Sequence, residues 1–140
     1  MKRVNNYFES ELIGENILHQ RILPVLPTLN ENAEQLKSVS DFMRSIPTES
    51  KGVVITDAKN SKLSGSEVRI QTGQWTKENS SLIEKTIIAQ IQYNTNLITS
   101  LLMKGVFLVS KPPVPVILVG TEAEAFAKAN ELLKLHKGAK

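Results

Sequence analysis

Few residues in this sequence could do chemistry, and the densest group follows a short apolar run, Gly52–Asp57. Asp57 closes that run, and Ser64 and Ser66 follow in a polar turn. If the run is a strand of a parallel sheet, Asp57 lies at its carboxyl end, where α/β proteins tend to bind ligands. A carboxylate there could bind a metal ion or accept a phosphoryl group. The alternative is a turn or cap residue.

The two serines also have two interpretations. Ser64 and Glu67 have the spacing of a capping box, which predicts that a helix begins here and that the serine caps it. A phosphate on Ser64 or Ser66 would instead meet the positive end of that helix and switch a partner surface. Asp57, Ser64 and Ser66 are therefore the candidate phosphorylation or partner surface.

Three apolar side chains are candidates for lining a groove. Trp75 is the only tryptophan, and it either covers the core or lines a groove used by a ligand or partner. Leu101 and Phe107 belong to an unusually apolar stretch that predicts a helix. That helix either covers the sheet or is partly exposed for dimerisation or for an apolar ligand.

Patterns for catalysis and metal binding are missing from the sequence. The two histidines, His19 and His136, have no companion ligand at metal spacing, and the second aspartate, Asp41, does not pair with Asp57. The absence of cysteine excludes disulfides, thiolate catalysis and cysteine-ligated zinc. No phosphate loop, nucleophile elbow or dinucleotide fingerprint is present. We expect no catalytic residue, metal or cofactor, and hence no enzyme.

The elements that must position these residues begin with a predicted hairpin. Residues 7–13 and 17–23 are β-prone runs on either side of Gly14, which suits a tight turn. Thr28 and Glu31 form a capping box for a helix that Pro47 ends.

Strands and helices alternate after this point. Gly52–Asp57, residues 86–92 and Val116–Val119 predict strands, and the first and the last of these are predicted to be buried. Helices are predicted after Ser64, with an interruption at Thr72 and Gly73, over residues 94–107, and after a Thr121–Glu124 capping box. The order ββαβαβαβα predicts an α/β domain with a mixed, mostly parallel five-stranded sheet and helices packed on it.

Length and charge narrow the class of protein. A chain of 140 residues predicts one domain, 1–140, with frayed tails at about 1–6 and 135–140. The net charge of +3 comes without basic residues interleaved with aromatics, so we expect no nucleic-acid partner. No stretch has the ~20 apolar residues of a membrane span, and no secretory signal is visible, so we expect a soluble, cytoplasmic protein.

The chain resembles a known family in residues 88–133. This stretch contains NLITSLLMKGVFLVSKPPVPVILVGTEAEAFAKANELL, a pattern of helix, Lys-Pro-Pro-x-Pro, strand and Glu/Ala-rich helix. It is similar to STAS domains, and more so to the bacterial stand-alone STAS-like or SEC14-like set of SpoIIAA-like fold. In the antagonist branch of that family a serine in an Asp-Ser-x-Gly turn is phosphorylated. The corresponding turn here contains Ser64 and Ser66, but Leu63 stands where the aspartate is expected.

The resemblance implies a function class. We expect a non-enzymatic STAS-like interaction and regulatory module, switched by serine phosphorylation, whose partner is another protein or a second copy of this chain. The alternative is a small carrier of a lipid or other apolar ligand, with a cavity between the residue 97–107 helix and the sheet, closed by Trp75. A third option is an enzyme of unrecognised type.

Overall fold

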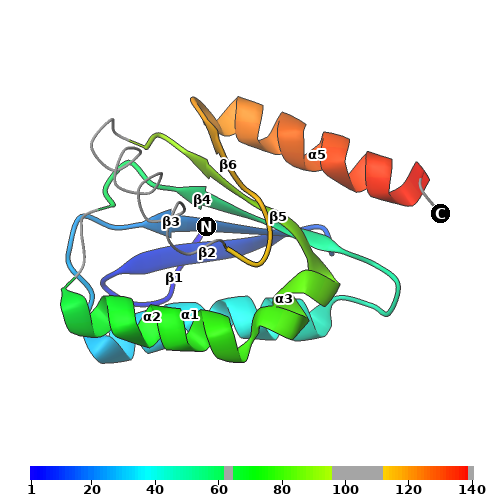
Figure 1. Cartoon of the computed structure of the whole chain (residues 1–140). Helices are drawn as coiled ribbons and strands as arrows, with labels where there is room; N and C mark the ends of the chain where they lie inside the picture. The colour runs from blue at the N-terminus through cyan, green and yellow to red at the C-terminus, as the bar shows by residue number, and fades with distance from the viewer. Residues whose placement is uncertain (62–64, 96–111, 139–140) are drawn as a thin grey trace.

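A six-stranded mixed sheet lies at the centre of the protein, between helices on both faces (Figure 1). The computed structural model describes residues 1–61, 65–95 and 112–138. Strands lie in the sheet in chain order; the first three are antiparallel to their neighbours, and the third to the sixth are parallel. The strands are β1 (Lys2–Arg3), β2 (Phe8–Ile13), β3 (Ile17–Ile22), β4 (Gly52–Asp57), β5 (Ile87–Tyr93) and β6 (Val116–Val119).

The described helices divide between the two faces of the sheet. They are α1 (Leu29–Ser45), α2 (Ser66–Glu78), α3 (Ser80–Thr86) and α5 (Glu122–Gly138). Figure 1 shows α1, α2 and α3 below the sheet and α5 above it. The first three connect neighbouring parallel strands, and right-handed crossovers that run in one direction put such helices on one face. The α/β class predicted from the sequence is confirmed.

The hairpin of β2 and β3 fixes the register of the first half of the sheet. Gly14 has φ +61°, a left-handed conformation that favours glycine. From this turn the pairing runs from Ile13 opposite Ile17 to Phe8 opposite Ile22. The predicted hairpin is confirmed, and each side chain of β2 thereby faces a defined side chain of β3.

The predicted threonine caps are present before α1 and before α5, and the capping box is complete at α1. At the start of α1, Thr28 Oγ1 accepts the Glu31 N–H at 3.1 Å, and Glu31 Oε1 accepts the Thr28 N–H at 3.0 Å. Before α5, Thr121 Oγ1 accepts the Glu124 N–H at 3.2 Å. Each bond satisfies a backbone donor that a helix leaves without an intrahelical partner.

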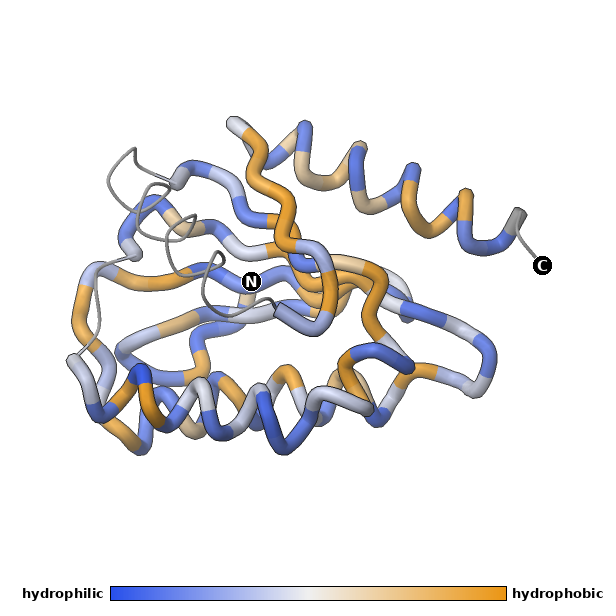
Figure 2. The backbone as a smooth tube through the Cα atoms, viewed as in Figure 1, coloured by the Kyte–Doolittle hydropathy of each residue, from blue (hydrophilic) through white to orange (hydrophobic). Residues whose placement is uncertain are grey.

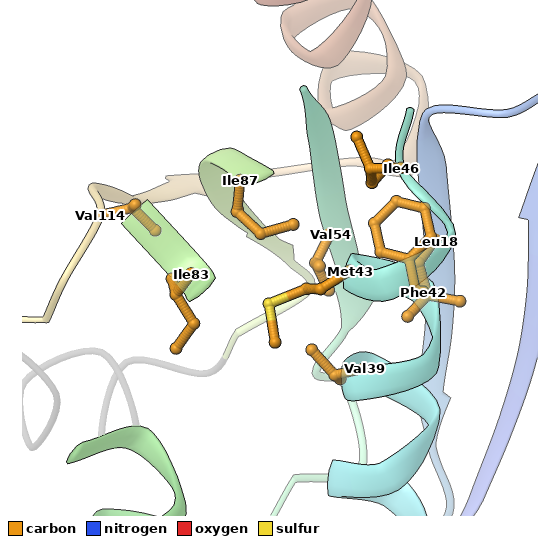
Figure 3. Packing of buried hydrophobic residues seen from close by; sticks show 9 residues of the cluster. All are labelled: Leu18, Val39, Phe42, Met43, Ile46, Val54, Ile83, Ile87 and Val114. Atoms are coloured by element: carbon orange, nitrogen blue, oxygen red, sulfur yellow. The ribbon is translucent and has the colours of Figure 1, made fainter. Parts of the chain in front are cut away.

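Two apolar clusters fill the space on either side of the sheet. The cluster under α1 and α3 contains Leu18, Val39, Phe42, Met43, Ile46, Val54, Ile83, Ile87 and Val114 (Figure 3). The cluster under α5 contains Ile17, Val53, Ile55, Ile91, Tyr93, Ala125 and Ala129. The two alanines are fully buried, so α5 approaches the sheet closely on small side chains. Figure 2 shows β6 as a mostly apolar segment and polar and apolar residues alternating along α5.

The number of strands and the structure of the two chain ends differ from the prediction. A sixth strand, β1, pairs Lys2 with Ser10 and Arg3 with Glu9, in a segment expected to be a frayed tail. At the other end, α5 continues to Gly138. The two residues of β1 are too few to show a sequence periodicity. Only their pairing with β2 makes them a strand. In addition β6 is half-buried along its length, since it is the outer strand of the sheet.

The helices between β4 and β5 also differ from the prediction. α2 begins close to the predicted place, at Ser66, with Gly65 as its N-cap and no side-chain bond from that residue. Ser64, the predicted cap, lies outside the described residues. The helix runs through Thr72 and Gly73 because α1 supports it there: Asn32 Nδ2 donates to Thr72 Oγ1 at 3.0 Å. The short helix α3 is an addition to the predicted order. The predicted helix over residues 94–107 lies outside the described residues.

Among the described residues, no helix is both long enough and apolar enough to cross a bilayer.

Two glycines provide a matched test of the packing. In Gly52→Ala the new Cβ would lie 2.8 Å from Phe42 Cζ and 3.0 Å from the Asn16 backbone oxygen. We expect a loss of about 1–3 kcal/mol in the free energy of unfolding, measured with urea. Gly73→Ala meets no atom within 4 Å inside a helix and should gain about 0.5–1 kcal/mol. Equal effects of the two substitutions would contradict this packing.

Candidate functional site

A row of polar side chains crosses the sheet near the carboxyl ends of its parallel strands. The register places Arg3 opposite Glu9, Glu9 opposite Arg21, Arg21 opposite Asp57, and Asp57 opposite Tyr93. The row thus contains one residue from each of β1 to β5, with charges that alternate in sign from Arg3 to Asp57. We call it the charged row. Cross-strand pairs of opposite charge stabilise a sheet.

Arg21 is the central residue of the charged row. Its Nε donates to Asp57 Oδ2 at 3.2 Å, and its Nη1 lies 3.6 Å from Glu9 Oε1. Desolvation by itself would lower the pKa of Arg21, but the hydrogen bond and the charge of Asp57 outweigh it, and the pKa is raised. Arg21 therefore stays cationic and bridges the antiparallel neighbour β2 and the parallel neighbour β4.

Asp57 is bonded through both of its carboxylate oxygens. Oδ2 accepts from Arg21, while Oδ1 accepts the Lys59 backbone N–H at 3.1 Å and the Asn94 Nδ2 at 3.5 Å. The bond to Lys59 is that of a turn residue at a strand end. This geometry supports the structural interpretation of Asp57. Across the described ranges, no group of three histidine or carboxylate side chains could bind a metal ion.

A buried histidine lies next to the charged row on the same face. His19 is 1% exposed; its Nε2 is 2.7 Å from the Tyr93 hydroxyl and its Nδ1 is 3.1 Å from Glu11 Oε1. The ring of Phe126 in α5 meets the His19 ring edge-on, with centroids 5.1 Å apart. Burial and the charges of Asp57 and Glu122 raise the pKa of Tyr93 to about 12. The protonated hydroxyl can donate to Nε2 while the Nδ1–H donates to Glu11.

Glu11 completes this chain of hydrogen bonds at the protein surface. The hydrogen bond from His19 lowers the pKa of the Glu11 carboxyl, so Glu11 is anionic at neutral pH. Sequence patterns placed His19 in a predicted strand, residues 17–23, without a companion metal ligand. The structure shows that the hydrogen bonds of His19 connect its own strand, β3, with β2 and β5.

A signal for these partners is present in the sequence. Glu9 and Glu11, and His19 and Arg21, lie two residues apart in their strands, so each pair occupies one face. In a hairpin that turns at Gly14, Glu11 falls opposite His19 and Glu9 falls opposite Arg21. The alternation of acidic and basic residues across one turn could therefore have shown the first half of the cluster.

The remaining candidate residues do not gather around Asp57. Ser66 is exposed as the first residue of α2. Trp75 lies on the other side of the sheet, packed against the core cluster under α1, with its Nε1–H donating to Ser40 Oγ at 3.1 Å. It also lines a groove of about 350 Å³ between α1 and α2, so both of its predicted roles have support. Ser64, Leu101 and Phe107 lie outside the described residues.

Two grooves lie at the opposite edge, where the parallel strands begin. One, of about 440 Å³, lies between the end of α5 and the start of β5, and the other, of about 780 Å³, lies between α1 and α3. Both are lined by Lys51 and His136, so they meet at these two side chains. We call the pair the amino-edge groove. Its volumes lie within the roughly 300–1,000 Å³ of typical ligand pockets.

Comparison of the chain with protein-family models, with curated proteins and with solved structures gave no significant match.

The pKa of Tyr93 can be tested directly, because the chain has two tyrosines. In a Tyr7→Phe variant, tyrosinate absorbance should appear with a midpoint of about 12. Since the folded state binds this proton more tightly, stability should be complete below about pH 10 and fall as the pH rises to about 12. Adding Tyr93→Phe should remove that fall. A midpoint near the ordinary value of about 10 would contradict the buried setting of Tyr93.

Proposed function

We propose that the protein is a non-enzymatic, STAS-like module that works by binding another protein. The resemblance over residues 88–133 supports this class, and β5, β6 and α5 have the element types that it implies. The charged row supports it as well, because Glu9, Arg21 and Asp57 are engaged with one another. In this proposal these charges stabilise the fold, and other side chains recognise the partner protein.

The observation that carries the proposal is an apolar patch near the start of α2. It comprises Val25, Leu26, Leu29 and Ile70, which are 41–60% exposed. The loop before α1 and the first turns of α2 lie close together, since Gln71 Nε2 donates to the Leu29 carbonyl oxygen at 3.1 Å. We call this patch the apolar rim. Exposed apolar side chains that gather in one place are typical of a docking surface.

Ser66 is placed where a phosphate would affect the apolar rim. Ser66 and Ile70 are four residues apart in α2 and both are exposed, so they lie on one face of the helix. A phosphate on Ser66 would put about −2 charges beside Ile70. We propose that phosphorylation weakens docking, because the charge would have to be desolvated in an apolar contact.

Substitution of Ile70 tests the proposed surface. Tagged protein is incubated with extract of the source cells, and retained proteins are compared with those retained by Ile70→Ser. We expect one protein whose retention falls roughly tenfold in Ile70→Ser, since burial of such a side chain contributes about 1.5–3 kcal/mol. Ser66→Glu should also lower the retention of this protein.

The control for that experiment is Leu12→Ser. Leu12 is 60% exposed on β2, like Ile70 in exposure but outside the apolar rim. Retention should be the same as for the unsubstituted protein. If Ile70→Ser and Leu12→Ser have equal effects, or if neither changes what is retained, the apolar rim is not the docking surface.

A second function, a carrier of an apolar ligand, has support from the amino-edge groove. The cavity predicted between the sheet and residues 97–107 involves residues outside the described ranges, and Trp75 lies between α1 and α2 instead. The amino-edge groove is at a different place; its half under α5 has a mostly apolar wall, and its size suits a small molecule. We propose it as the ligand site of a carrier.

A further inference from the structure

We infer that the amino-edge groove binds an amphipathic anion, a medium-length alkyl chain that ends in a carboxylate. This inference rests on the second proposed function, the carrier, and names the chemistry of its ligand. The alkyl chain lies along the apolar wall under α5, and the carboxylate lies where the two grooves meet, at Lys51 and His136.

The wall under the end of α5 is apolar in most of its lining. Six of its nine lining residues are apolar: Ile87, Ile88, Pro113, Val114, Leu132 and Leu135. Leu135 is 62% exposed, so a part of this surface remains in contact with water in the protein alone. An alkyl chain along the wall would remove apolar surface from water on both molecules.

The second groove supplies unpaired positive charge. Arg44, Lys51 and Lys85 line it, and within the described residues none of the three forms an ion pair. Lys51 Nζ donates to the Glu84 backbone oxygen at 3.1 Å, which leaves further N–H groups of the ammonium for a ligand. The acidic lining residues of the amino-edge groove are Glu49 and Glu84, so cations outnumber anions there.

His136 contributes a polar atom that needs a partner. Its Nε2 is buried and has no hydrogen-bond partner in the part of the chain that the structure describes. A buried polar atom without a bond destabilises the folded protein unless a ligand or water satisfies it. Because His136 lines both halves of the groove beside Lys51, a carboxylate at that junction could accept hydrogen bonds from both side chains.

Two probes of equal chain length separate the apolar and the charged parts of the inference. Binding of decanoate and of 1-decanol to the full chain is measured by calorimetry, or by NMR where the heat is small. We expect decanoate to bind roughly tenfold more tightly than decanol, the ratio given by one charge-assisted hydrogen bond. The preference should shrink as salt is added, because the charged groups lie near the surface.

Variants identify the residues that bind the carboxylate. Lys51→Met and His136→Leu should each reduce the affinity for decanoate roughly tenfold and leave that for decanol within about twofold. Lys59→Met is the matched control: Lys59 is exposed at the opposite edge of the sheet, and its removal changes the net charge equally. This control should bind decanoate like the unsubstituted protein.

The outcomes distinguish the inference from the function on which it rests. Equal binding of decanoate and decanol, unaffected by Lys51→Met and His136→Leu, overturns recognition of the anion and leaves the apolar carrier standing. Binding of neither probe overturns both. Neither result bears on docking at the apolar rim, which lies at the other edge of the sheet.

Discussion

The pairing of Arg21 with Asp57 is the interaction on which the rest of the structure depends. It lies between β3 and β4, where the sheet changes from antiparallel to parallel neighbours. No turn connects two adjacent parallel strands, so their register must come from side chains that meet across them. Arg21 supplies this link while it also reaches Glu9 in β2. Asp57 is then oriented to accept the Lys59 N–H that turns the chain away from β4.

Most of the fold could be predicted because its signals are local. The glycine turn of the hairpin, the capping box before α1, the threonine cap before α5 and the apolar run of β4 each involve neighbouring residues. β1 and the continuity of α2 could not be predicted, since they depend on contacts between distant residues. Lys2 and Arg3 form a strand only against β2, and Asn32 of α1 bonds to Thr72 of α2.

The candidate site shows the same division between local and distant contacts. The sequence singled out Asp57, whose position at a strand end is a local feature. Arg21 and Tyr93, its neighbours in the charged row, come from two other strands. The register of parallel strands cannot be found by counting residues from a tight turn, because no such turn connects them. The partners within the hairpin were accessible to sequence reasoning. The amino-edge groove was not, because His136 and Lys51 are 85 positions apart and meet only through the fold.

A double-mutant cycle on Arg21 and Asp57 tests most directly whether the charged row acts on the fold itself. The free energies of unfolding of Arg21→Met, Asp57→Asn and the double variant are compared with that of the unsubstituted protein. A coupling energy of about 1 kcal/mol or more is predicted for residues in one bonded network. Additivity to within about 0.3 kcal/mol would contradict this role of the charged row.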